Sequence, residues 1–311
     1  MNYIYASAAE SRNYGDWIIE YASREMLSTY FPEPAAVQDM FSKNLLPGEY
    51  DFMIIPGVTM LTPDARPFLS CLKDASYPIY CLAGNYWVQS LPKSGFLFKN
   101  SVRMKGNDVV GDLSVVEQLQ QPVGVRDPFT ARLLQSNGVG VKFTGCPTIH
   151  MSDEGCGDDG YVLFSFGRGN EYAQVRAAHG LAKKHHVVCI CHEPLDFDRF
   201  KAAGLKLPLI DFEGDIELYL SYFKRASVVV SGRLHGVLPS IAFKKPVFYY
   251  GTNDSRTTLL EVLGVKIHRY KDIKYSVDRA AQLPNRAVIA YFRKQWDEML
   301  QSIKSNHDDK K

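Results

Sequence analysis

The chain lacks three features that would quickly narrow its class: an excess of charge of one sign, a long apolar run, and cysteines spaced as in a disulfide framework. Its 36 basic and 34 acidic side chains give a net charge of +2, which is too small to predict a nucleic-acid partner from bulk electrostatics. Any site for an anion must therefore be local. No apolar run approaches the ~20 residues that cross a bilayer, and the first residues have no basic segment followed by an apolar one, as a secretory signal does.

These absences predict a cytoplasmic protein, with peripheral contact at the inner face of a membrane as its closest association. The six cysteines are scattered and several lie inside apolar runs, which indicates reduced thiols. Cys189 and Cys191 alternate along a predicted strand and point to opposite faces, so they cannot easily grip one metal ion, even with His192 beside them. We expect no metal site and no cofactor.

What the chain has is an ordinary globular composition and a long alternation of strand and helix patterns. Its 311 residues are 46% hydrophobic, enough for two domains of about 150 residues, and no solenoid-type repeat is visible. Strands are expected at 3–7, 50–56, 78–83, 122–125, 141–144, 161–166, 186–191, 207–211, 227–230 and 247–250. Helices are expected at 16–30, 128–134, 171–184, 215–225, 259–263 and 284–303, with a further one ending at 243. This alternation predicts parallel strands with helical crossovers.

A polar, glycine-rich segment between 150 and 160 divides the alternation into two sets. The fold class expected is α/β, with two Rossmann-like doubly wound parallel-sheet domains that face a cleft. The expected domains are 1–152, 160–283 and a terminal helix with a polar tail at 284–311. In open parallel sheets ligands bind outside the carboxyl ends of the strands, so the residues that follow strands are the candidates for function.

The segment Ser231–Gly236 (SGRLHG) carries the sharpest signal, because it lies between a predicted strand and an apolar helix. Gly232 permits a tight turn, and the free N–H groups of the helix's first turn would point into the cleft. Arg233 adds a planar cation suited to phosphate or carboxylate, and His235 can move a proton near neutral pH. The alternative is a helix start whose arginine pairs with an acid and whose histidine fills space.

Three other loops after strands are weaker candidates. In Gly124–Pro128 (GVRDP), Arg126 would face the cleft from the first domain, while Asp127 caps the next helix. In Asn13–Asp16 (NYGD), Gly15 allows close backbone approach, and Asp16 is either a general base or the helix N-cap. In Gly167–Asn170 (GRGN), glycines around Arg168 suggest an anion cradle, although the spacing fits neither a Walker A loop nor a dinucleotide fingerprint.

Taken together, Asn13–Asp16, Gly124–Asp127 and Ser231–Gly236 resemble the polysaccharide pyruvyltransferase family in residues, order and placement, and the likeness extends over nearly the whole chain. The resemblance implies a glycosyltransferase-B-like fold, phosphoenolpyruvate as the donor and ketal formation on a hexose or N-acetylhexosamine. It associates Arg126, Arg233, Leu234 and His235 with donor binding, and Asp16 with the acidic position of the first motif. Family members often carry a lysine after the YYG strand, where this chain has Thr257 and Thr258, with Arg256 as the nearest cation.

Chemistry agrees with the resemblance, because phosphoenolpyruvate carries a carboxylate and a phosphate of about −1.5 to −2 and needs concentrated positive charge. In our hypothesis Arg126 and Arg233 bind the negatively charged groups of phosphoenolpyruvate. Further substrate-binding residues are Asn13, Gly15, Arg168, Gly232 and Arg256. Protonated His235 acts as general acid toward the enol carbon, and Asp16 takes the proton of the acceptor hydroxyl. The acceptor is a sugar or a lipid-linked oligosaccharide; its identity and the oligomeric state stay open.

Two other functions remain as alternatives. A sugar-nucleotide-dependent glycosyltransferase could use the same arginine at a helix N-terminus, although only Glu261 is placed to hold a ribose. A binding module without catalysis would need no group that titrates near neutral pH, which disfavours it beside His235.

Overall fold

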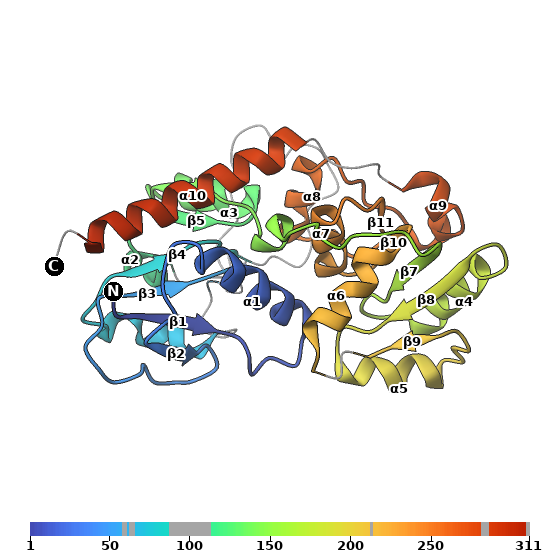
Figure 1. The fold of residues 1–311 in the computed structure, drawn as a ribbon, viewed down its shortest axis with the longest axis horizontal. Helices are drawn as coiled ribbons and strands as arrows, with labels where there is room; N and C mark the ends of the chain where they lie inside the picture. The colour runs from blue at the N-terminus through green and yellow to red at the C-terminus, as the bar shows by residue number, and fades with distance from the viewer. Residues whose placement is uncertain (58–60, 62–65, 87–112, 212–213, 281–285, 309–311) are drawn as a thin grey trace.

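Two parallel sheets, one in each half of the chain, form the framework of the molecule (Figure 1). The computed structural model describes residues 1–57, 61, 66–86, 113–211, 214–280 and 286–308. In the first half the strands are β1 (Tyr3–Ser7), β2 (Ala36–Asp39), β3 (Phe52–Ile55), β4 (Ile79–Cys81), β5 (Val123–Val125) and β6 (Val141–Phe143). Their order is β2-β1-β3-β4, and a bridge between Gly84 and Val125 adds the β5-β6 pair beyond β4.

The second sheet has the order β11-β10-β7-β8-β9, with all neighbours parallel. Its strands are β7 (Tyr161–Ser165), β8 (His186–Ile190), β9 (Leu209–Ile210), β10 (Val228–Ser231) and β11 (Val247–Tyr249). Counted along the chain from β7, this is the Rossmann order 3-2-1-4-5, whose direction reverses between β7 and β10. The loops after these two strands therefore flank the crevice where such sheets bind ligands.

Helices cover both faces of both sheets. The first half contributes α1 (Tyr14–Leu27), α2 (Ser114–Glu117), α3 (Pro128–Ser136) and the 3-10 helices η1 (Pro67–Asp74) and η3 (Pro147–His150). The second half contributes α4 (Glu171–Leu181), α5 (Pro194–Ala202), α6 (Ile216–Arg225), α7 (Leu234–Ala242), η4 (Ser255–Thr257), α8 (Thr258–Val262), η5 (Tyr270–Tyr275), α9 (Ser276–Arg279) and α10 (Arg286–Asp308).

Alternation along the strands divides the apolar side chains between two layers, as parallel sheets with covered faces require. In β7, Tyr161 and Leu163 belong to one buried cluster, whereas Val162 and Phe164 belong to another. In β1, Ile4 and Ala6 belong to the same cluster as Tyr161 and Leu163, which is therefore shared by the two halves. Tyr3 and Tyr5 belong to a separate cluster that includes residues of α10.

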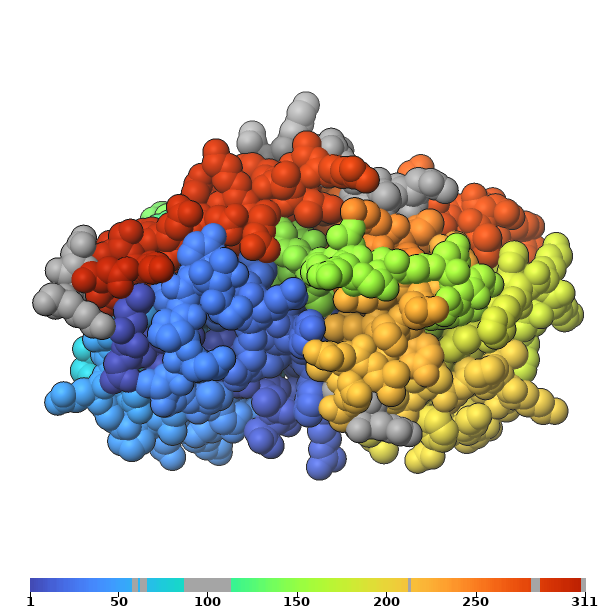
Figure 2. Space-filling model, viewed as in Figure 1, coloured from blue at the N-terminus to red at the C-terminus, as the bar shows by residue number. Residues whose placement is uncertain are grey.

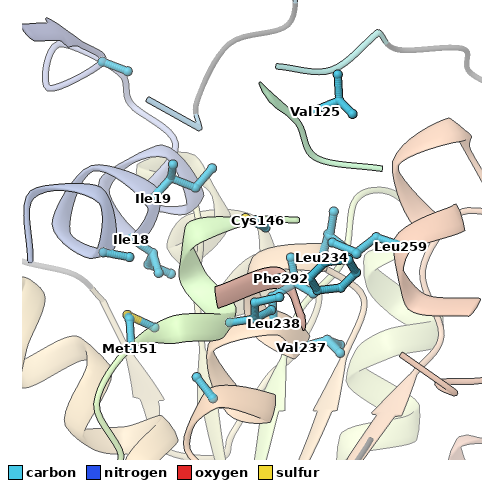
Figure 3. Packing of buried hydrophobic residues seen from close by; sticks show 14 of the residues in the cluster. Ile18, Ile19, Val125, Cys146, Met151, Leu234, Val237, Leu238, Leu259 and Phe292 are labelled. Carbon is cyan, nitrogen blue, oxygen red and sulfur yellow. The ribbon is translucent and has the colours of Figure 1, made fainter. Parts of the chain in front are cut away.

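The shared cluster continues through both halves and holds them together. Figure 3 shows Ile18 and Ile19 of α1 and Cys146 and Met151 of the connecting segment, with Val237 of α7 in the same buried layer. Gly57 brings the first half close to this segment, since a Cβ there would lie 2.6 Å from Pro147 Cδ. Figure 2 shows the two halves in direct contact on this face, with the last helix over the first half.

The predicted α/β fold class is confirmed, because the strands of both sheets are parallel and alternate with helices along the chain. The predicted strands lie within a few residues of their expected ends. Strand β2 was not predicted, because AVQD is short and half-exposed with no apolar periodicity. Helix α1 begins at Tyr14 rather than Asp16. The expected boundary at 283 lies outside the described residues, and the domain limits stay a prediction.

Candidate active site between the two halves

A cavity of about 520 Å³ lies at the carboxyl ends of β7, β10 and β11, beside the point where the strand order reverses. From the first half it receives Asn13 and Gly15, and the other lining residues come from loops of the second half. Among the predicted site residues the lining includes Asn13, Gly15, Arg168, Gly232, Arg233, Leu234, His235 and Arg256. Asp16 and Arg126 are not part of the lining.

Glycine allows the two loops that flank this crevice to touch. A Cβ on Gly232, after β10, would lie 2.5 Å from the Cα of Gly167, after β7. Below them the Ser165 and Ser231 hydroxyls hydrogen bond at 2.9 Å. At the start of α7, within the described chain, the backbone N–H groups of Leu234 and His235 have no acceptor. They are available to an anion in the cavity.

The first turn of α1 packs against the second half and restricts the position of the His235 ring. The Tyr14 N–H donates to the His192 carbonyl at 2.9 Å, and the Tyr14 hydroxyl donates to Asp211 Oδ1 at 2.8 Å. At the next position, a Cβ on Gly15 would lie 2.6 Å from Nδ1 of His235. The two motifs that are 220 residues apart in sequence therefore meet face to face.

Gly15→Ala is expected to lower turnover at the candidate site by about 10- to 100-fold, because a methyl group would push the His235 ring away and small displacements of reacting groups cost this much. Overpacking should also cost about 1–3 kcal/mol of stability. Gly180→Ala is the control: no atom lies within 4 Å of a Cβ there, and alanine in α4 should stabilise slightly. Steady-state kinetics and thermal unfolding of both variants check this; unchanged turnover in Gly15→Ala would contradict it.

His235 is uncharged in the ligand-free protein at neutral pH. Burial holds its pKa well below the usual range, and the charges of Arg126 and Arg256 lower it further. Its Nε2 is buried and has no hydrogen-bond partner in the described structure. The lowered pKa does not favour the protonated form that our hypothesis assigns to His235 as a general acid, and that role stays a prediction.

The arginines that line the cavity are already paired with carboxylates. Arg233 donates to Glu193 Oε1 at 2.8 Å and to Asp196 Oδ2 at 3.1 Å. Arg168 shares Glu193, and Arg256 pairs with Asp254 at 2.5 Å. The role expected for Arg233 thus changes: it ties the loops after β8 and β10 together, and much of its charge is compensated.

Arg126 is the opposite case. It is 3% exposed, its Nε has no hydrogen-bond partner, and among the described residues no carboxylate forms an ion pair with it. It is not part of the cavity lining, but it is near enough to act on His235, which is, and on the buried thiol of Cys146. Asp127 is near enough for an electrostatic effect, but a buried cation without a direct ion pair is costly, so Arg126 is a candidate to bind an anion.

Asp127 caps α3 as predicted: its Oδ1 accepts from the Thr130 N–H at 2.9 Å, and its Oδ2 accepts from the Thr130 hydroxyl at 3.0 Å. Burial raises the pKa of Asp127 from 3.8 to about 6, against the opposing effects of Thr130 and Arg126. The folded protein therefore holds this proton more tightly than the unfolded chain. The stability contributed by protonation is present below about pH 4 and is lost as pH rises to about 6.

Asp127→Asn keeps the cap and removes the charge, so we expect it to raise the free energy of unfolding by about 1–3 kcal/mol at pH 7.5. The gain should shrink at pH 5, where the aspartate is already partly protonated. Urea unfolding of both proteins at the two pH values measures it. A variant that is less stable than the parent at pH 7.5 would show that Asp127 stabilises the fold as an anion.

Asp16 is not part of the cavity lining, although its neighbour Gly15 is, and the prediction that it caps α1 is wrong. The N-cap of α1 is Asn13, whose side chain accepts from the Gly15 N–H at 3.0 Å, so Asp16 is not the cap. Its Oδ2 instead accepts from the Ser11 hydroxyl at 2.6 Å and from Arg66 at 3.2 Å. A carboxylate held in this way outside the lining is not positioned as a general base for a ligand in the cavity.

Two residues at or near the site were not among those predicted from the sequence. His192 lines the cavity, and its Nε2 lies 2.7 Å from the Ser165 hydroxyl. Gln174 holds the loop after β7, since it accepts from the Gly167 N–H at 2.6 Å and donates to two carbonyls of that loop. Position directly after a strand was a usable signal for His192, whereas nothing in the sequence indicates the loop contacts of Gln174.

The described part of the chain offers no cluster of three or more His, Cys, Asp or Glu side chains that could hold a metal ion. None of its helices combines the length and the hydropathy that a crossing of the bilayer requires. Glu261, the residue considered for a ribose, is exposed on α8 and is not part of the cavity lining.

These features define a two-lobed GT-B-like α/β protein with a polar, glycine-lined cavity between its halves. The model of the polysaccharide pyruvyl transferase family matches residues 113–255 of this chain, which confirms the resemblance over that stretch. The stretch includes Arg126 and the whole Ser231–Gly236 motif, but not the Asn13–Asp16 motif.

Solved structures support the fold over the whole length. The chain is similar to the Staphylococcus aureus MnaA–UDP co-structure, with 14% identity, a TM-score of 0.56 and coverage of 98% of this chain and 96% of that one. It is also similar to UDP-GlcNAc 2-epimerase from Methanocaldococcus jannaschii, with 12% identity, a TM-score of 0.58 and coverage of 98% and 99%. No curated protein sequence matches the chain. At these identities the likeness shows the fold alone.

Proposed function

We propose that the protein transfers the pyruvyl group of phosphoenolpyruvate to two hydroxyl groups of a sugar in a surface polysaccharide or its precursor, forming a ketal and releasing phosphate. The observation that carries the proposal is Arg126, a buried guanidinium without a carboxylate partner among the described residues. It lies near a histidine at the edge of the cavity. The family match over residues 113–255 supports the reaction class.

In this proposal the donor's negative charge is bound at Arg126 and at the open N–H groups of α7. Arginine suits carboxylate and phosphate because its planar fork makes paired hydrogen bonds. The first turn of α7 adds the positive end of the helix dipole. A cavity of about 520 Å³ also lies within the range that small-molecule ligands occupy.

The proton for catalysis enters with the donor. A phosphate monoester has its second pKa near 6, so part of the donor carries a proton at neutral pH. Once bound, its negative charge opposes the arginines that keep His235 neutral and raises the pKa of that ring. His235 then protonates the enol CH₂ carbon, which becomes the methyl group of the ketal.

The remaining steps balance without Asp16. The first sugar hydroxyl attacks C2 and returns a proton to His235. The second hydroxyl then displaces phosphate: the bond between C2 and the oxygen that links it to phosphorus breaks, this oxygen leaves with the phosphate, and the phosphate takes the hydroxyl proton. One histidine thus serves as acid and then as base, a pattern open to a group near neutral pH.

The test is phosphate release from phosphoenolpyruvate by the purified protein against a panel of nitrophenyl and lipid-linked sugars, with mass spectrometry of the product. We expect release that depends on the acceptor, together with a product that carries the pyruvyl ketal. Calorimetry with nucleotide sugars is the parallel measurement. Tight binding of a nucleotide sugar without binding of phosphoenolpyruvate would replace the proposal by a glycosyltransferase.

A further inference from the structure

Asn85 is a buried amide whose hydrogen-bonding capacity is unused. It follows β4, is fully buried at 0% exposure, and neither Oδ1 nor Nδ2 has a hydrogen-bond partner in the described structure. Leaving a buried amide unpaired costs free energy, and folded proteins pair nearly all such groups. An amide with no partner among the described residues is therefore a candidate to bind a ligand.

Backbone pairing places Asn85 beside Arg126. The Gly84 N–H donates to the Gly124 carbonyl at 2.9 Å, and the Arg126 N–H donates to the Gly84 carbonyl at 2.9 Å. Gly84 and Val125 are thus paired in a parallel ladder, where paired residues share a face and successive residues alternate. The residues that follow the pair, Asn85 and Arg126, consequently lie on one common face.

Neither Asn85 nor Arg126 is part of the cavity lining, but the backbone next to Asn85 contacts a loop that contributes to it. The carbonyl of Tyr86, next to Asn85, accepts from the Ser255 hydroxyl at 2.9 Å. Ser255 directly precedes Arg256 and Thr257, which line the cavity. The Asn85 amide, the Arg126 Nε and the His235 Nε2 are buried and have no hydrogen-bond partner in the described structure, and Arg126 is near enough to act on His235, which lines the cavity.

The chemistry of the amide indicates which substrate it takes. An amide presents both a donor and an acceptor, and both atoms are unpaired, so the argument is the same for either orientation of the group. The carboxylate and phosphate of the donor substrate mainly accept hydrogen bonds and leave the amide oxygen without a partner. Neighbouring sugar hydroxyls donate and accept at once, and they satisfy both atoms.

We propose that Asn85 binds the acceptor sugar, with Oδ1 accepting from one hydroxyl and Nδ2 donating to its neighbour, and so aligns this pair of hydroxyls with the donor held at Arg126. This assignment rests on the proposed function. It makes Asn85 a substrate-positioning residue of the first half of the chain. The specificity for two suitably spaced hydroxyls would originate in this one side chain.

Gln174 shows how an amide that serves the fold looks in the same molecule. It is also 0% exposed, but its Oε1 accepts from the Gly167 N–H at 2.6 Å and from the Tyr250 hydroxyl at 2.8 Å. Its Nε2 donates to the Gly167 and Gly169 carbonyls at 3.1 Å and 2.5 Å. The two amides form a matched pair that separates a structural role from a ligand-binding role.

The experiment compares Asn85→Leu, Asn85→Ala and Gln174→Leu by thermal unfolding without ligand and by acceptor kinetics. Removing an unpaired amide should leave the melting temperature of the two Asn85 variants equal to or above that of the parent, whereas Gln174→Leu should lower it. In both Asn85 variants kcat/KM for the acceptor should fall by about 10- to 100-fold. Affinity for phosphoenolpyruvate, measured by calorimetry, should change by less than about threefold.

Two results would overturn the assignment: acceptor kcat/KM within twofold of the parent in Asn85→Ala, or melting temperatures of both Asn85 variants lowered as far as in Gln174→Leu. Failure of the proposed function looks different. In that case the parent protein itself forms no ketal with any acceptor. The unfolding measurements, together with binding of the free sugar panel to parent and Asn85→Ala, then still decide whether Asn85 holds a hydroxyl-bearing ligand.

Discussion

His235→Gln is expected to lower kcat for ketal formation by about 10²- to 10⁴-fold, the range that general acid–base catalysis supplies. Glutamine can place an amide near the position of Nε2, so the polar contact survives while proton transfer is lost. Affinity for phosphoenolpyruvate should stay within about threefold of the parent. Single-turnover phosphate release and calorimetry measure the two quantities separately.

The pH dependence sharpens this expectation. Because burial and the neighbouring arginines keep the pKa of His235 well below its usual range in the free protein, the protonated form becomes more populated as pH falls. We therefore expect kcat/KM of the parent to rise from pH 8 toward pH 6, and this slope to disappear in His235→Gln. Parent turnover in the variant, or an unchanged slope, would remove His235 from the chemistry.

Arg126→Met is expected to weaken phosphoenolpyruvate binding by about 30- to 1,000-fold, since the loss of one partner of a buried charge pair costs roughly 2–4 kcal/mol. At the same time it should raise the melting temperature of the ligand-free protein. The parent buries this charge without a carboxylate partner in the described structure, and methionine removes the charge while filling the space.

Arg233→Met is the matched control, because its guanidinium is paired with Glu193 and Asp196. Removing it leaves two carboxylates with less compensation, so the melting temperature should fall. Opposite signs for the two arginine variants would separate a ligand-binding cation from a structural one. An Arg126→Met protein that melts lower and binds phosphoenolpyruvate normally would contradict the ligand-binding role.

The sequence was sufficient for the architecture because strand and helix periods are local. Strands such as β7 and β10 are apolar runs closed by glycine or serine, and their loops follow in order. The cavity-lining motifs could be found for the same reason: glycine, arginine and histidine at the end of a parallel strand have a predictable position.

Pairing was the part that local pattern could not provide. The contact of Arg233 with Glu193 joins residues that are 40 apart in sequence. Taken alone, Glu193 is plausible as a helix cap and Arg233 as an anion-binding residue. The contact of Asp16 with Arg66, 50 residues away, could not be predicted either. Asn85 was missed because a lone asparagine after a strand has many ordinary roles, and only its burial without a partner distinguishes it.

The path of α10 has a consequence for the order in which the molecule can be completed during synthesis. Trp296 and Leu300 of this helix are buried in one cluster with Tyr3 and Phe52, and His307 lies 3.1 Å from the Tyr80 hydroxyl. Because β1 and β3 are synthesised long before α10, one face of their sheet stays without this cover until α10 has been made. Until then this face is an exposed apolar surface that chaperones must shield or that invites association between nascent chains.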